Sequence, residues 1–437
     1  MAHHPAPASD TEDLSAVVPR AYAWVVFALT AGLLVSDYMS RQVLNAVYPL
    51  LKAEWALSDA QLGSLSGVVA LMVGLLTVPL SLLADRWGRI KSLTVMAISW
   101  SLATLMCGLS NHFGEMFAAR LFVGVGEAAY GSVGMAVVLS VFPPSMRATL
   151  AGTFLAGGMF GSVLGMALGG VLAARFGWRW SFAGMAAFGL TLALLYSMIV
   201  REARIAPPRA KAVHAVEPAS TRPPLSSLFD NRSVVSAYIG SGLQLFVGAA
   251  LLAWIPSFMY RYYEMPIDRA GLVSAVFVLI SGAGMIVCGM LSDRLCQHRP
   301  ERKVTLAIAY CLISCVLLST AFRLPTGPAQ LALIAAGMFL AAGTAGPAGA
   351  MVANLTHASI HGTAFATLTL ANNLLGLAPG PLVTGVLADR MGLRAAFALV
   401  PLISIVAALA FIHARRHYHH DLERIRGLCA PGRGISP

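Results

Sequence analysis

The stretch "SLLADRWGRIK" (81–91) places a short charged turn between two long apolar runs, at residues 59–83 and 91–110. Each run has about 20 residues or more, enough for a helix to cross a ~30 Å hydrocarbon core. A related stretch, "GMLSDRLCQ" (289–297), repeats the turn much later in the chain, with Asp293 and Arg294 where the first has Asp85 and Arg86. The turn therefore predicts membrane helices joined by short charged turns, and its recurrence predicts two related halves.

The composition agrees with a membrane protein. Hydrophobic residues make up 57% of the 437 residues and charged residues only 11%, whereas soluble domains carry about 25% charged residues. The net charge of +11 is spread over helix ends, which argues against nucleic acid as a partner. We predict an all-α membrane protein with twelve transmembrane helices, at residues 22–51, 59–83, 91–110, 114–141, 147–174, 179–201, 232–260, 268–292, 303–322, 328–354, 361–388 and 393–415.

A second repeat supports a duplicated six-helix unit. "GVLAARFGWRWSF" (170–182) and "GVLADRMGLRAAF" (385–397) are identical at eight of thirteen positions, and many secondary transporters are built from such repeats. We predict two pseudo-symmetric six-helix bundles and polar connecting segments. Their bounds are a tail at 1–21, an N-terminal bundle at 22–201, a linker at 202–231, a C-terminal bundle at 232–415 and a tail at 416–437.

The distribution of Lys and Arg predicts the orientation. Most of these residues lie in segments that would share one side of the membrane with both termini, which favours cytoplasmic termini. The N-terminal "MAHHPAPASDTEDL" has no basic region and is not expected to be a cleaved signal peptide. Few Lys, many Arg and abundant Ala and Gly suggest a bacterial source, so we expect a multi-pass protein of the cell inner membrane, in contact with membrane lipids and monomeric.

The chain resembles the major facilitator superfamily over essentially its whole length. The stretch 81–91 is similar to that family's signature between helices 2 and 3, with Ser81 in place of its first glycine. Within the superfamily, "SRQVLN" (40–45), "ARLFVGVGEAAYGS" (119–132) and "NNLLGLAPGPLVTGVLADR" (372–390) resemble the Spinster-like branch, although Ser40 stands where that branch usually has Asp. The resemblance implies alternating access and a latch that joins the two bundles on the cytoplasmic side in the outward-open state, made here by Asp85, Arg86, Arg89, Asp293 and Arg294.

Four charged residues fall well inside apolar spans, all in the N-terminal half. Asp37 and Arg41 share one face of helix 1, and Arg120 and Glu127 share one face of helix 4. A charge facing lipid costs several kcal/mol, roughly 2.5–3.5 on insertion scales, so mutual pairing near mid-membrane is expected, with Arg41 in reach of both acids. One hypothesis is a static salt-bridge cluster; the other is a proton-coupling site, with Glu127 as proton carrier, Arg41 as its competing partner or the ligand of a substrate anion, and Asp37 as a second acid.

The C-terminal half lacks such buried charge. Polar candidates there are Thr344 of helix 10 and the amides Gln244, Asn372 and Asn373. Helical amides can bind a ligand or merely bond to neighbouring helices. A charged face opposite a mostly apolar one suits an amphiphilic ligand. The residues expected to contact substrate are Arg41, Arg120, Glu127, Tyr130, Gln244, Trp254, Asn372 and Asn373.

Other functional classes lack their motifs. "GVGEAA" (124–129) matches a dinucleotide fingerprint but has no preceding strand, and no P-loop, zinc-binding His pair or nucleophile elbow occurs, so we expect no cofactor, no metal and no enzymatic activity. The predicted function is secondary active transport, with proton coupling and an amphiphilic lipid-like or small anionic substrate. Open alternatives are a proton symporter of small organic anions, a drug/proton antiporter and, in another class, a membrane sensor that binds ligand without moving it.

Overall fold

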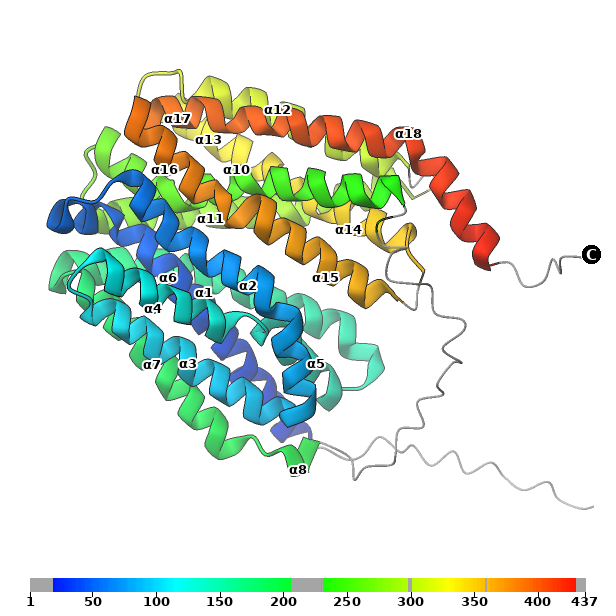
Figure 1. Ribbon diagram of the computed structural model, residues 1–437, viewed down its shortest axis with the longest axis horizontal. Coiled ribbons are helices and arrows are strands. Elements are labelled where there is room, and N and C mark those ends of the chain that lie inside the picture. The colour runs from blue at the N-terminus through cyan, green and yellow to red at the C-terminus, as the bar shows by residue number, and fades with distance from the viewer. Residues whose placement is uncertain (1–18, 206–228, 230, 298–300, 358–359, 430–437) are drawn as a thin grey trace, which may run out of the picture.

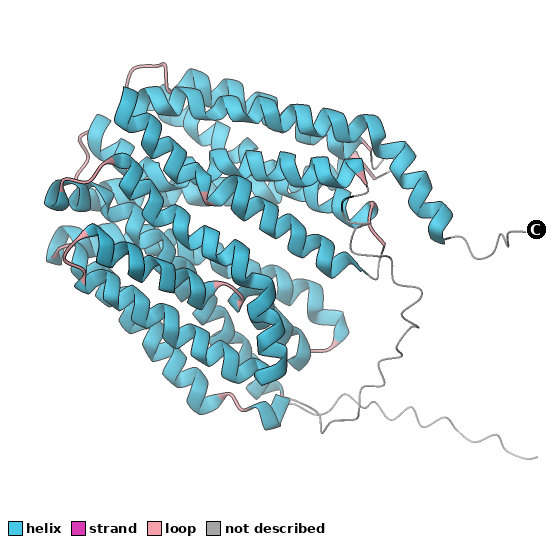
Figure 2. Cartoon of the chain, in the orientation of Figure 1, coloured by secondary structure: helices cyan, strands magenta, loops and turns pink. Residues whose placement is uncertain are grey.

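The computed structural model describes residues 19–205, 229, 231–297, 301–357 and 360–429. In these residues the chain consists of helices joined by short turns, without a strand (Figure 2). Twelve helical segments of this part are long and apolar enough to cross a membrane. The predicted all-α membrane architecture with twelve spans is confirmed.

The helices form two bundles, one from each half of the chain (Figure 1). The N-terminal bundle, followed by the short α8 (Glu202–Ile205), contains α1 (Arg20–Trp55), α2 (Asp59–Trp87), α3 (Arg89–Leu109), α4 (Phe113–Glu127), α5 (Tyr130–Val141), η1 (Pro144–Met146), α6 (Arg147–Phe176) and α7 (Trp178–Ile199). The C-terminal bundle contains α10 (Arg232–Tyr262), α11 (Ile267–Leu295), α12 (Arg302–Ala321), α13 (Pro328–Ala341), η3 (Ala342–Thr344), α14 (Ala345–Asn354), α15 (His361–Asn372), η5 (Asn373–Leu377), α16 (Pro379–Met391), α17 (Leu393–Leu399), η6 (Val400–Leu402) and α18 (Ile403–Cys429). Most of the predicted linker, at 206–228 and 230, lies outside the described residues, as do 1–18 and 430–437.

Several predicted spans are broken, which their apolar patterns did not indicate. The fourth span is interrupted between α4 and α5, where Ala129 leaves helical geometry (φ −111°, ψ 0°) and the Thr77 hydroxyl donates to the Ala128 carbonyl at 2.6 Å. The eleventh contains the π-helical turn η5, just before Pro379 and Pro381, whose missing N–H groups disturb the preceding helical turn. The twelfth continues beyond the expected end at 415 because α18 runs on to Cys429.

The sequence repeat is preserved in the turns. Gly177 (φ 90°) is the single residue between α6 and α7, and Gly392 (φ 84°) is the single residue between α16 and α17. Gly88 (φ 102°) makes the same kind of turn between α2 and α3. A positive φ is accessible to glycine at little cost, so these three glycines permit one-residue turns between antiparallel helices.

In the described residues, the hydrophobic contact between the two bundles is concentrated at one end. At the end that carries the α1–α2 turn, which we call the Asp59 end, one hydrophobic core contains residues of both bundles, including Tyr48 of α1 and Trp254 of α10. At the opposite end, the Asp85 end, each bundle has a separate core. α2 packs against α16, and α6 against α11, across the boundary. Figure 1 shows the bundles side by side at the Asp59 end and spreading apart toward α8 and α14.

Candidate functional site

The charges predicted to meet do so at the contact between α1 and α4. The Arg41 Nε–H donates to Asp37 Oδ1 at 3.0 Å, and the same nitrogen lies 2.8 Å from Glu127 Oε2. The guanidinium also lies 5.2 Å from the centre of the Tyr38 ring. Arg41 thus forms ion pairs with both acids, as the sequence predicted.

The two oxygens of Glu127 have different surroundings. Oε1 accepts a hydrogen bond from the Ser40 hydroxyl at 2.9 Å. Oε2 is buried and receives no hydrogen bond from the described residues, because the nearby Arg41 N–H is directed at Asp37. A buried carboxylate oxygen that lacks a donor is the position on this cluster where an added proton would fit.

Arg120 holds the helices around the cluster. Its Nη1 donates to the Ser40 carbonyl at 3.0 Å and its Nε to the Leu65 carbonyl of α2 at 3.2 Å. The structure records no ion pair of Arg120 with either acid in the described residues, so the expected mutual pairing of all four charges is only partly met. Asp37, Arg120 and Glu127 are 1–2% exposed, whereas the Arg41 side chain is 20% exposed. Arg41 is therefore the accessible member of the charge cluster (Asp37, Arg41, Arg120 and Glu127).

A second polar network, which the sequence analysis missed, follows α1 toward the Asp59 end. The Asn45 side chain donates to Gln42 Oε1 at 2.7 Å and accepts from the Ser66 hydroxyl at 2.8 Å. The Ser66 and Tyr48 hydroxyls are 2.5 Å apart. The spacing of Gln42 and Asn45, one turn apart within an apolar run, was the available signal.

Among the candidates in the C-terminal bundle, three amides keep an unpaired oxygen. Gln244 donates to the Ser314 hydroxyl at 3.2 Å and Asn373 to the Thr369 carbonyl at 2.9 Å, but their side-chain oxygens, and that of Asn372, have no hydrogen-bond partner in the described residues. Asn373 opens the π-helical turn η5. All three oxygens are buried in this conformation, so they could accept hydrogen bonds from a ligand only after becoming exposed.

Three other candidates are positioned differently from the expectation. Tyr130 lies in the core of the N-terminal bundle, where its hydroxyl donates to the Thr30 carbonyl at 2.8 Å and its ring packs on Trp100, so the predicted ligand contact is not available to it here. Trp254 is fully buried at the bundle boundary and donates to the Pro381 carbonyl at 2.9 Å. Thr344 bonds to the Ala341 carbonyl within η3.

The predicted Asp-Arg latch is not closed in this conformation. Asp85 pairs with Arg89 of its own bundle at 3.0 Å, and Asp293 pairs with Lys303 of its own bundle at 2.6 Å. Arg86 and Arg294 are exposed at the same end. The five predicted latch residues thus lie at the Asp85 end, where the two bundles are separated.

A different set of charges joins the bundles at the Asp59 end. Asp59 accepts two hydrogen bonds from Arg261 of α10, at 2.8 and 2.6 Å, and one from Lys52 at 2.6 Å. Asp389, at the end of α16, accepts from the backbone N–H groups of Asp59 and Ala60 at 2.7 and 2.8 Å. We call Asp59, Arg261 and Asp389 the Asp59 clasp. Of its members, only Asp389 had a signal in the sequence, the tetrapeptide Leu-Ala-Asp-Arg at 387–390, which also occurs at 83–86 and does not indicate a partner.

No group of three or more His, Cys, Asp or Glu side chains in the described part of the chain is arranged to hold a metal ion. The five cysteines whose state is described are buried and free. The side chains of the charge cluster can form ion pairs and hydrogen bonds and can exchange protons.

Comparisons with known proteins agree with this fold. Residues 30–377 and 239–435 match the model of the Major Facilitator Superfamily. The probable L-galactonate transporter of Escherichia coli (strain K12) is 26% identical over 405 residues, covering 89% of this chain and 88% of that protein. Protein spinster homolog 3 of Danio rerio is 24% identical over 433 residues, covering 91% and 86%. A crystal structure of a bacterial homolog to the human lysosomal transporter Spinster, inward-facing and occupied, superposes with a TM-score of 0.84 at 21% identity, covering 92% and 99%.

Proposed function

The chain belongs to the major facilitator superfamily, resembles its Spinster proteins, and works by alternating access; we propose that it moves an organic anion together with a proton. The observation that carries the proposal is the shared Arg41 nitrogen, 3.0 Å from Asp37 and 2.8 Å from Glu127, beside a buried Glu127 oxygen that lacks a donor.

Charge balance in the cluster explains why proton and anion would travel together. The two acids and two arginines of the charge cluster cancel when all are ionised. A proton on Glu127 releases Arg41 from one partner and leaves a surplus positive charge in a buried region, where unbalanced charge is costly. A substrate anion at the exposed edge of Arg41 restores neutrality. Each ligand thus favours the binding of the other, which is the requirement for symport.

A small polyhydroxylated acid is the leading substrate class. Its carboxylate would pair with Arg41, and its hydroxyl groups would donate to the unpaired amide oxygens of Gln244, Asn372 and Asn373. The likeness to an L-galactonate transporter supports this class. An amphiphile with an anionic head is the second candidate, supported by the likeness to Spinster proteins over most of the chain.

The proposed orientation follows the distribution of Lys and Arg, with both termini in the cytoplasm of a bacterial cell. The Asp59 end would then face outward and the described conformation would be open to the cytoplasm. In the opposite conformation, Asp85, Arg86, Arg89, Asp293 and Arg294 are proposed to close the cytoplasmic end while the Asp59 clasp opens.

Flux measurements in proteoliposomes test the function. A pH-sensitive dye inside the vesicles reports proton entry after addition of sugar acids, aromatic acids or lysolipids at an inward proton gradient. We expect a small carboxylate to bring protons in with it. Lysolipid-driven proton entry would favour the second candidate. Binding without flux would indicate a sensor, and flux unaffected by the pH gradient would contradict proton coupling.

A further inference from the structure

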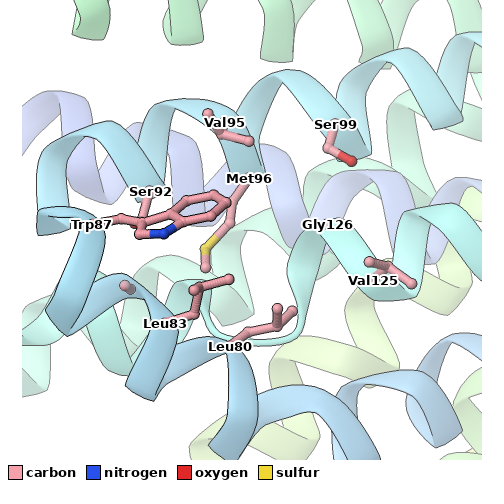
Figure 3. A pocket seen from close by; sticks show the side chains of 10 residues that line it. Leu80, Leu83, Trp87, Ser92, Val95, Met96, Ser99, Val125 and Gly126 are labelled. Carbon is pink, nitrogen blue, oxygen red and sulfur yellow. The ribbon is translucent and has the colours of Figure 1, made fainter.

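A narrow apolar pocket lies on the N-terminal bundle between α2, α3 and α4, away from the charge cluster. Its volume is about 140 Å³, and Figure 3 shows side chains of α2 facing those of α3 across it. It is lined by Leu80, Leu83, Ala84, Trp87, Ser92, Val95, Met96, Ser99, Val125 and Gly126. The deep end reaches Gly126, the residue before Glu127.

The pocket opens to the outside of the bundle. α3 packs against α4, α5 and α7 of its own bundle, and Val95 and Trp87 on the pocket wall are 58% and 64% exposed. In a membrane-spanning helix, a side chain exposed on this outer face meets lipid tails. The occupant expected from position and lining is therefore an acyl chain of the bilayer.

The wall of the pocket contains a polar group without a partner in the described residues. The Ser92 side chain lines the pocket and is 6% exposed, yet its hydroxyl makes no hydrogen bond in the described residues. Leaving such a group unbonded in an apolar environment is costly. An ester carbonyl at the start of an acyl chain would accept its hydrogen bond.

Two cations adjacent in sequence to pocket-lining residues have no ion-pair partner in the described residues, since Arg86 precedes Trp87 and Lys91 precedes Ser92. Arg86 and Lys91, on either side of the Gly88 turn, are exposed and form no ion pair in the described residues, while Arg89 is paired with Asp85. Glu202 of α8 packs against Gly88, but Arg201 and Arg204 flank it, so positive charge is in excess. Clusters of Lys and Arg beside a membrane helix attract anionic lipid headgroups.

We propose that this pocket is a binding site for one anionic phospholipid. One acyl chain lies between Leu83 and Met96, the Ser92 hydroxyl donates to its ester carbonyl, and Arg86 and Lys91 bind the phosphate. The site shares Arg86 with the proposed latch, but lipid binding is measured without transport, so its test does not depend on the proposed function.

Native mass spectrometry of the detergent-purified protein tests the site. The protein is titrated with phosphatidylglycerol and with phosphatidylcholine of the same chains, and the first bound lipid is counted. We expect phosphatidylglycerol to bind at least fivefold more tightly. Lys91→Gln should weaken its binding about fivefold, the change that ~1 kcal/mol per cation near an anionic surface produces, and leave phosphatidylcholine unaffected.

Two further variants separate the headgroup from the chain. Ser99→Phe places a large side chain on the wall of the pocket and should reduce binding of both lipids. Ser99→Leu replaces it if the larger side chain lowers the melting temperature. Arg294→Gln removes an exposed arginine at the corresponding end of α11, where no such pocket was found in the described residues, and should change nothing.

Three outcomes would overturn the proposal. Equal binding of the two lipids would show that the headgroup is not recognised. Unchanged binding in both Ser99 variants would show that the acyl chain does not occupy the pocket. Displacement of the lipid by glycerol phosphate, which has the headgroup chemistry without a chain, would indicate a bare anion site.

Discussion

Arg261 of α10 places two guanidinium nitrogens on the carboxylate of Asp59, the first residue of α2, at 2.8 and 2.6 Å. The two residues belong to different bundles and are 202 positions apart in the chain. The Asp59 side chain is 3% exposed, so the pair is largely shielded from water and salt. This contact, with Asp389 on the N-terminus of α2, closes the Asp59 end.

Asp59→Asn is expected to open this end of the transporter. The change removes the ionic part of a bidentate pair, and hydrogen bonds to charged groups contribute about 1.5–3 kcal/mol, so the closed population should fall about tenfold or more relative to the open one. Spin labels at Asn111 and Thr326, both exposed at the Asp59 end, report the separation by pulsed electron resonance in a cysteine-free background. Lys52→Gln is the matched control because Lys52 contacts Asp59 from the same bundle. An equal shift in both variants would show that the cross-bundle pair has no special role.

Gly67→Ala should open the same end by a steric route. A methyl group at Gly67 would collide with the backbone carbonyl of Ala378 on the other bundle, so α2 must separate from the segment before α16. The same spin-label pair should show a longer distance. Gly131→Ala is the control, since a methyl group there meets nothing within 4 Å and favours the helix by about 1 kcal/mol. An unchanged distance for Gly67→Ala would mean that the contact between α2 and Ala378 rearranges locally, without opening the Asp59 end.

Glu127→Gln is expected to uncouple transport from protons. The amide has nearly the shape of a protonated acid, so the substrate should still exchange across the membrane, while accumulation driven by a pH gradient is lost. Counterflow and gradient-driven uptake are measured in the same proteoliposomes. Glu115→Gln changes an exposed acid of the same helix and should leave both activities intact. Gradient-driven accumulation at the normal level in Glu127→Gln would exclude this residue as proton carrier.

Arg120→Met should destabilise the protein and, because it removes one of the two positive charges that balance the charge cluster, should also alter the proton dependence of transport. The substitution removes the charged side-chain hydrogen bonds to the helical carbonyls of Ser40 and Leu65, which we expect to cost ~1.5–3 kcal/mol. The melting temperature in detergent should fall by several degrees, and Arg120→Lys should restore part of it. An Arg120→Met variant with unchanged melting temperature and unchanged proton dependence would show that Arg120 contributes neither to stability nor to the charge balance.

The charge cluster could be predicted from the sequence for a simple reason. A charge inside a membrane span is costly unless it is paired, so Asp37, Arg41 and Glu127 were expected to form ion pairs. The helical spacing placed them on helix faces that can meet. The sequence could not show that Arg120 bonds to backbone carbonyls, or that Tyr130 turns into the bundle core. Both depend on which neighbour is nearest after packing.

The Asp59 clasp was missed because its residues look ordinary in the sequence. Asp59, Arg261 and Asp389 lie at helix ends, where charges are expected in any membrane protein and carry no sign of a partner. Their pairing depends on how two bundles, separated by half the chain, meet at one end.

The sequence by itself determined the twelve spans, the two related halves and the buried charges, because a helix that crosses a membrane must be apolar, about 20 residues long and hydrogen-bonded within itself. Only the tertiary structure decided the breaks within the spans, the partner of each charge and which end of the molecule is closed. These depend on contacts between residues far apart in the chain, and a transporter of this kind has two such sets of contacts close in free energy, between which its sequence does not choose.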